Sequence, residues 1–190
     1  MSERRRRYLI YGAATALSIA LFAAMDFGVA QVCKTACSAV WSMDHVKKFR
    51  IADEIYHHGL APNVTVVDDW GGRHYPLATN SLGFKDATPR DVPLKSDRRR
   101  FLFIGDSFTE GQGVPWEESL TGRIADGLAP AGIEVLNAAV SSYAPGIFYS
   151  KLRHFIGERG LTVERVFALI DMSDIYDEAY LYNLTEDGRS

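Results

Sequence analysis

The pattern of apolar and polar positions divides the chain into three parts. Residues 8–25 form an apolar run without a charged side chain, and residues 56–84 are rich in β-forming residues. From residue 101 onward, short apolar runs alternate with helical patterns, which predicts a parallel sheet covered by helices. We therefore expect an α/β protein whose parts span residues 1–32, 33–97 and 98–190.

The apolar run near the N-terminus predicts a membrane helix. About 20 apolar residues cross a bilayer, and four arginines at positions 4–7 precede the run. Positive charges stay on the cytoplasmic side, so we expect a membrane anchor with the following part extracytoplasmic, in the periplasm. The alternative is secretion after cleavage of a signal peptide, because Gly28, Val29 and Ala30 place small residues before Gln31.

The middle part predicts a connector, a small β-rich segment and a linker. Residues 39–54 favour a juxtamembrane helix or connector, residues 56–84 a β-hairpin or meander, and the polar residues 85–100 a linker. Cys33 and Cys37 lie four positions apart without a matching cysteine or histidine cluster. We expect a solvated or loosely paired couple there rather than a zinc site.

The last part predicts about three core strands, each followed by a helix. The strands are expected at residues 101–105, 133–137 and 163–172, and the helices at residues 116–130, 144–160 and 173–184. Strands and helices that alternate at this spacing form parallel sheets with right-handed crossovers.

Composition and one motif narrow the function. The net charge is −3 and no basic stripe is interleaved with aromatic residues, so we expect no nucleic-acid partner. The stretch GDSFTEGQG, residues 105–113, places a serine directly after the first core strand, where open α/β sheets bind ligands. A serine nucleophile needs an exposed hydroxyl, a nearby base and N–H groups that stabilise an oxyanion. The alternative is that Asp106 and Ser107 only cap a helix.

This stretch, together with TNSLGFKD at residues 79–86, resembles the SGNH (GDSL-type) hydrolase family in its bacterial, membrane-associated members. The resemblance implies a flavodoxin-like parallel sheet, with Ser107 as the nucleophile and Asp106 as a brace of the turn. The other matching positions of this block are Gly105, Thr109 and Gly111. The implied chemistry is ester hydrolysis at the cell envelope, on an acylated small molecule or glycan, without metal or organic cofactor. A polysaccharide O-acetyltransferase-type domain is the alternative within the family.

The resemblance also implies an oxyanion hole built from three blocks. Ser142 stands where the second block has a glycine, and a backbone N–H survives that change. Ser173 stands where the third block has an asparagine, and its hydroxyl reaches less far than an amide. The implied oxyanion donors are Ser107, Ser142 and Ser173, with Asn137 and Asp174 as supporting motif positions.

The family's general base and its orienting acid come from an Asp-x-x-His pattern that does not occur in this sequence. Only His154 follows Ser107, and its mid-helix position favours packing; His57, His58 and His74 are candidates for lining the site or binding a partner. We therefore expect the N-terminal portion of a longer protein, or a truncated copy, with an incomplete sheet and negligible turnover. The alternative is a non-catalytic relative that binds a glycan or a partner protein.

Overall fold

The computed structural model describes residues 2–40, 49–180 and 182. The chain divides into two compact units, Met1–Val46 and Lys47–Ser190, which we describe separately. Two predictions fall outside the described part of the chain: the side-chain state of Cys33 and Cys37, and the end of the last helix beyond residue 182.

The predicted apolar helix near the N-terminus is confirmed. Helix α1 covers Glu3–Val40. Its stretch Glu3–Val32 has a mean hydropathy of 1.7 and is long and apolar enough to cross a membrane. A signal sequence meets the same criteria of length and composition. Within the predicted connector, Arg50–Asp53 form strand β1 rather than a helix, and residues 41–48 lie outside the described residues.

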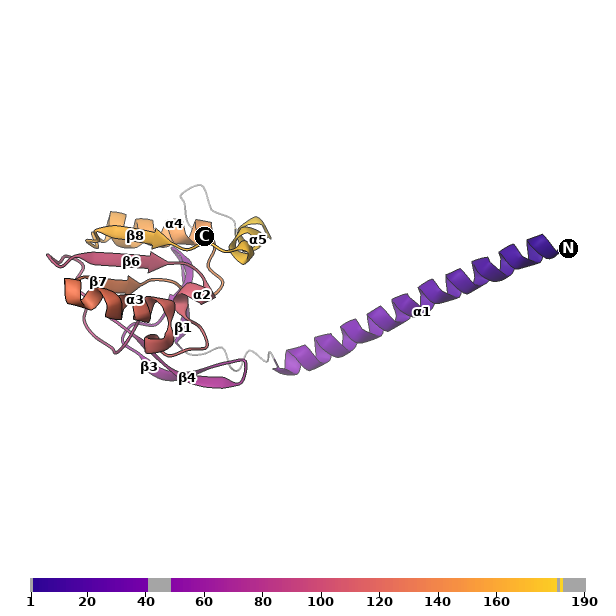
Figure 1. The fold of residues 1–190 in the computed structure, drawn as a ribbon, viewed down its shortest axis with the longest axis horizontal. Coiled ribbons are helices and arrows are strands. Elements are labelled where there is room, and N and C mark those ends of the chain that lie inside the picture. Colours follow the sequence, from indigo (N-terminus) through magenta and orange to yellow (C-terminus); the bar gives the residue numbers. More distant parts are fainter. Residues whose placement is uncertain (1, 41–48, 181, 183–190) are drawn as a thin grey trace. The chain divides into compact units, whose positions relative to one another are not determined.

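The second unit is built on a six-stranded sheet with the strand order β3-β4-β5-β7-β6-β8 (Figure 1). The strands are β3 Thr65–Trp70, β4 Arg73–Thr79, β5 Lys85–Asp86, β6 Arg100–Ile104, β7 Glu134–Asn137 and β8 Arg165–Ala168. A separate antiparallel hairpin pairs β1 with β2, His57–Leu60. The α/β class is confirmed, but the sheet is mixed rather than wholly parallel.

The three strands expected after residue 98 form the parallel half of this sheet. Strand β6 pairs in parallel with β7 on one side and with β8 on the other. Leu102 and Phe103 point to opposite faces of the sheet and are 1% and 6% exposed. Burial on both faces explains why the run FLFI is apolar throughout instead of alternating.

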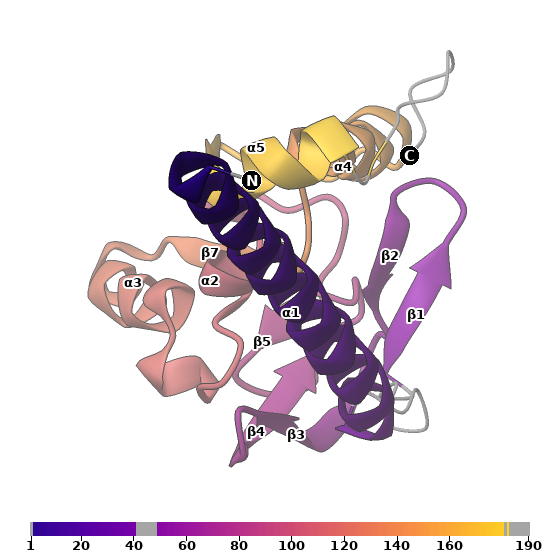
Figure 2. The same ribbon diagram turned by 90° about the vertical axis from the view of Figure 1, so that its right-hand side faces the viewer.

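Helices cover both faces of the parallel half. The helices are α2 Ser107–Glu110, α3 Leu120–Leu128, α4 Pro145–Leu152 and α5 Met172–Tyr180, with 3₁₀ turns at Trp116–Glu118 and Ala129–Ala131 and a π-helical turn at Arg153–Glu158. On one face, Asn137 donates a hydrogen bond to Thr121 of α3. On the other face, Leu136 packs in one cluster with Phe155, which follows α4. Leu136 and Asn137 are successive strand residues, so α3 and α4 lie on opposite faces (Figure 2).

The β-rich segment continues this sheet, which the sequence did not indicate. Strands β3, β4 and β5 pair antiparallel in succession, and β5 pairs antiparallel with β7. The predicted linker is therefore wrong at both ends, because Lys85 and Arg100 are buried strand residues. Lys85 Nζ donates to the carbonyls of Gly111 and Val114, and Arg100 forms an ion pair with Glu134 at 2.6 Å. These partners are distant in sequence, so nothing near Lys85 or Arg100 indicates that the two side chains are buried. Their positive charges alone therefore suggested that they are exposed to solvent.

Candidate functional site

Ser107 lies at the carboxyl end of the central parallel strand. It is the first residue of α2, and its half-buried hydroxyl donates to Asp106 Oδ2 at 3.3 Å. Asp106 caps the helix, since its Oδ1 accepts a hydrogen bond from Phe108 N at 2.9 Å. The capping alternative is thus correct for Asp106, and the same cap fixes the turn that presents Ser107.

The strand ends meet around the turn, which leaves no room for a side chain at Gly105. Gly105 O accepts from Val140 N after β7, and the preceding carbonyl, of Ile104, accepts from Leu169 N after β8. A Cβ atom on Gly105 would lie 2.3 Å from Thr109 Oγ1 and 2.9 Å from Leu169 O. The motif glycine is therefore required by close approach of two neighbouring segments.

A pocket of about 300 Å³ opens beside Ser107. Its lining includes Ser107, the exposed aromatic residues Trp70 and Phe108, and Leu120 of α3. A larger pocket of about 420 Å³ lies at the opposite end of the parallel strands, around the start of β7, and its lining contains none of the predicted site residues. Of these two pockets, the one beside Ser107 is lined by predicted motif residues, Ser107 and Gly111, but Ser142 and Ser173 are not among its lining residues.

The second motif block lies beside the first. Asn137 is fully buried, and its Nδ2 donates to Thr109 O at 3.0 Å, which joins β7 to α2. Ser142 is exposed and has a left-handed backbone with φ +63°. This conformation favours glycine, the residue that the resemblance places there. In the described part of the chain, the Ser142 N–H donates to no protein acceptor.

Glu110 is a buried site residue that the sequence analysis missed. Its carboxylate accepts two hydrogen bonds from Arg50, at 2.7 and 3.1 Å, and one from Ser141 N at 2.6 Å. Arg50 belongs to β1 and Ser141 to the loop after β7, so one carboxylate joins three segments behind the Ser107 turn. In the sequence, the only local sign of this role is that Glu110 directly precedes the motif glycine Gly111.

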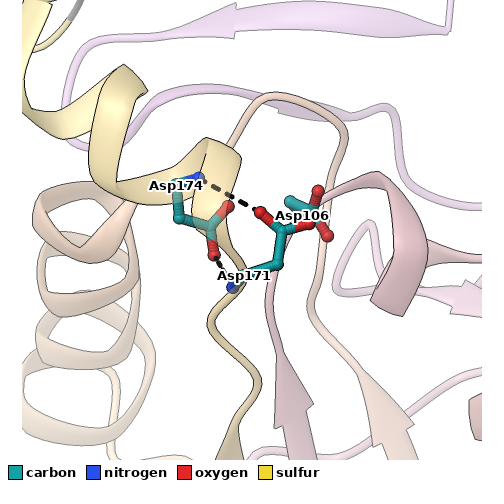
Figure 3. Close-up of side chains that lie close together, drawn as sticks. All are labelled: Asp106, Asp171 and Asp174. Atoms are coloured by element: carbon teal, nitrogen blue, oxygen red, sulfur yellow. Dashed lines mark hydrogen bonds between the residues drawn. The ribbon is translucent and has the colours of Figure 1, made fainter.

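Three carboxylates from two motif blocks come together (Figure 3), and one of them, Asp106, accepts the hydrogen bond from the Ser107 hydroxyl. Asp106 follows β6, while Asp171 and Asp174 follow β8, and one oxygen from each lies within 4.8 Å of the other two. Burial and the neighbouring carboxylates of Asp106 and Asp171 raise the pKa of Asp174 to about 6. Ser173 is exposed, and its hydroxyl donates to Asp171 Oδ1 at 2.6 Å. In this arrangement the Ser173 hydroxyl is hydrogen-bonded to Asp171.

No histidine of the described residues contacts Ser107. His58 is half-buried, and its Nε2 donates to Ser141 O at 2.8 Å, so it lies beside the second block. Its Nδ1 contacts His57 Nδ1 at 2.8 Å, and burial lowers the pKa of His58. His74 pairs with Asp69 on β3, and His154 pairs with Glu158 one helical turn away.

A buried lysine lies under the second block. Lys151 Nζ donates to Ala138 O and to the Tyr143 hydroxyl, both at 2.9 Å, and lies over the rings of Tyr56 and Phe84. Burial lowers the pKa of Lys151 to about 7. Helical periodicity alone gave no sign that this lysine faces the core.

No protein-family model matches the chain, and no curated protein matches it. The function is therefore inferred from the residues and their geometry.

Proposed function

We propose that the second unit is an SGNH-type domain that acts on ester or O-acyl groups, with Ser107 as the nucleophile. The observation that carries this proposal is the position of Ser107. Its hydroxyl lies on a capped turn at the carboxyl end of the central parallel strand and lines a pocket of about 300 Å³. Open α/β sheets bind their ligands at this edge.

The order of the parallel strands supports the flavodoxin-like assignment. The first, second and third parallel strands in sequence are β6, β7 and β8, and their spatial order is β7-β6-β8. This corresponds to 2-1-3, with which the flavodoxin-like order 2-1-3-4-5 begins. The antiparallel strands β3, β4 and β5 extend the sheet beyond β7.

In the proposed reaction, Ser107 Oγ attacks the acyl carbonyl carbon and the carbonyl oxygen becomes an oxyanion. The N–H of Ser107 has no acceptor within its own helix because Ser107 is the first helical residue. The N–H of Ser142 is the second donor in the proposal. The Ser107 hydroxyl proton passes through solvent to the departing alkoxide, so collapse of the intermediate releases the alcohol and leaves an acyl-serine. Water or a sugar hydroxyl then takes the acyl group and returns a proton to Ser107.

Two features lower the expected rate. The Ser173 hydroxyl is bonded to Asp171, and the loss of one oxyanion donor typically costs ~100- to 1,000-fold in rate. No histidine among the described residues contacts Ser107, and the sequence contains no Asp-x-x-His. We therefore propose acylation of Ser107 with very slow turnover for this chain.

A covalent probe tests the proposal. The full-length chain in detergent micelles is treated with a fluorophosphonate, and modified peptides are mapped by mass spectrometry. We expect phosphonylation of Ser107 to exceed that of every other serine and to disappear in Ser107→Ala. Ser96→Ala, which changes a half-buried serine outside the pocket, should leave the labelling of Ser107 unchanged. An unmodified Ser107 would contradict the nucleophile assignment.

A second candidate function is glycan binding without catalysis. The exposed aromatic residues Trp70 and Phe108 favour it, because they flank the pocket at 52% and 76% exposure. A defined O-acetylated oligosaccharide should then raise the melting temperature of wild type and of Ser107→Ala equally. Trp70→Ala should abolish the rise. Equal melting temperatures with and without the oligosaccharide would exclude this candidate for that glycan.

For location, we propose that α1 anchors the chain, with its arginines cytoplasmic and the second unit extracytoplasmic. The apolar stretch Glu3–Val32 and the arginines at positions 4–7 support this orientation. N-terminal sequencing of the protein from cell envelopes distinguishes the anchor from secretion after cleavage. An N-terminus at Met1 or Ser2 supports the anchor, and an N-terminus near Gln31 supports cleavage.

A further inference from the structure

We propose that the carboxylates of Asp106, Asp171 and Asp174 bind a hard divalent cation, Ca²⁺ or Mg²⁺, at the carboxyl ends of β6 and β8 (Figure 3). The sequence led us to expect no metal. The three residues belong to two separate motif blocks, and only the parallel pairing of β6 with β8 brings them together.

The spacing of the carboxylates fits a single ion. One oxygen from each residue lies within 4.8 Å of the other two. Oxygen ligands lie about 2.3–2.6 Å from Ca²⁺ and about 2.0–2.1 Å from Mg²⁺. Two ligands on opposite sides of an ion are therefore about 4–5 Å apart, and neighbouring ligands are closer. The observed separations match ligands of one cation after small side-chain adjustments.

Asp174 supplies a second observation that points to a ligand. Its side chain is 0% exposed, and its Oδ2 accepts a hydrogen bond from Asp171 N at 3.0 Å. Its Oδ1 is buried and has no hydrogen-bond partner in the described part of the chain. Figure 3 shows this oxygen on the side that faces the Asp171 carboxylate. A buried carboxylate oxygen normally accepts a hydrogen bond or binds a metal ion. Asp174 Oδ1 is therefore positioned as a metal ligand.

The negative charge of the three carboxylates also favours a bound cation. Asp106 is 6% exposed and Asp171 is half-buried, so solvent screens the three carboxylates poorly. Within the described residues, none of the three forms an ion pair with lysine, arginine or histidine. Their protein donors are backbone N–H groups and the hydroxyls of Ser107 and Ser173. An all-oxygen, carboxylate-rich set is the one that Ca²⁺ and Mg²⁺ prefer.

The position in the sheet agrees with a ligand site. The chain leaves β6 toward β7 on one side and later returns to β8 on the other, so the strand order reverses at β6. Ligands of open α/β sheets bind outside the carboxyl ends of the strands at this reversal. Cation binding here does not depend on the chemistry proposed for Ser107.

Calorimetry of the full-length chain tests the site. The protein in detergent micelles is treated with EDTA, dialysed and titrated with CaCl₂ or MgCl₂. We expect one ion per chain with a Kd on the order of 0.1–1 mM, as in extracellular calcium-binding modules. Asp174→Asn should weaken binding by at least about tenfold. Asp126→Asn, which removes an exposed carboxylate on α3, should leave the Kd unchanged.

Melting temperatures show whether Asp174→Asn has lost ion binding or has failed to fold. Wild type should melt at a higher temperature with the bound ion than with EDTA. Asp174→Asn should melt in EDTA no lower than wild type, because it removes a repulsive charge, and should not respond to the ion. Absence of saturable binding of both ions up to about 10 mM, tenfold above the expected range, would overturn the proposal. Equal binding by Asp174→Asn would overturn it as well.

Discussion

At the scale of single residues, the motif glycines have the least freedom to change. A Cβ atom on Gly105 would lie 2.9 Å from Leu169 O, a backbone atom that moves only with the β8 end. We predict that Gly105→Ala lowers the free energy of unfolding by about 1–3 kcal/mol, the usual cost of overpacking. Chemical denaturation of the purified chain measures the change.

Gly127→Ala provides the matched control for this prediction. Gly127 is exposed within α3, and a Cβ atom there would have no neighbour within 4 Å. Because alanine favours a helix by about 1 kcal/mol over glycine, this variant should be equally or more stable. A Gly105→Ala variant as stable as wild type would show that the turn around Ser107 is not tightly packed.

The lowered pKa of Lys151 predicts that the stability of the fold depends on pH. Burial lowers its pKa to about 7, whereas a lysine in the unfolded chain titrates near 10.4. Between these values the unfolded state binds more protons than the folded state, so the free energy of unfolding rises with pH. From pH 7 to 9 wild type should gain about 2 kcal/mol more than Lys151→Met.

The exposed residue Lys95 provides the control for the lysine prediction. Denaturant titrations at pH 7, 8 and 9 should give Lys95→Met the same dependence on pH as wild type. If Lys151→Met shows the wild-type dependence too, the Lys151 ammonium does not lose its proton in this pH range.

Local pattern predicted some site residues and missed others for a physical reason. Asp106 and Ser107 follow a buried strand and precede a glycine, so the turn could be inferred from adjacent positions. Glu110 owes its role to Arg50, sixty residues earlier in the chain. Asp171 gains its significance from Asp106 across the sheet. Residues whose partners come from other strands cannot be identified before the strand order is known.

At the scale of elements, β8 is an exposed edge of the sheet. It occupies one end of the strand order, and its residues Val166 and Phe167 are 38% and 36% exposed. An exposed apolar edge strand can pair with a second copy of the chain. We predict concentration-dependent self-association of the chain in detergent, and at least a several-fold weakening by Val166→Lys, measured by sedimentation velocity.

The helix surface offers the control for the edge prediction. Tyr149 on α4 is 55% exposed, so Tyr149→Lys removes a similar apolar side chain outside the edge. Its association should equal that of wild type. Equal association of Val166→Lys and wild type would show that β8 is not the contact.

Element types were predicted better than their assembly. The apolar run FLFI and the helical pattern after it led to β6 and to the helices that follow it. The mixed sheet was not predicted, because β5 has only two residues, both charged. Its pairing with β4 and β7 depends on backbone hydrogen bonds and on the buried Lys85 ammonium. Neither feature gives a hydrophobic period that a sequence analysis can detect.

At the scale of the whole molecule, α1 supplies an apolar helix and the second unit supplies a serine on a parallel-strand edge. Loss of the histidine base of a serine hydrolase costs on the order of 10⁶-fold in kcat, and the small residual rate comes from the oxyanion donors and from binding. We therefore expect Ser107 to be acylated only by an activated ester, whose leaving group departs without being protonated, and then to release the acyl group extremely slowly.

The most direct measurement combines product release with peptide mapping after addition of p-nitrophenyl acetate to the full-length chain. We expect about one p-nitrophenol per chain above the Ser107→Ala background, with the acetyl group found on Ser107. Continuous turnover above the Ser107→Ala background, or an acetylated protein without acetyl on Ser107, would contradict this expectation.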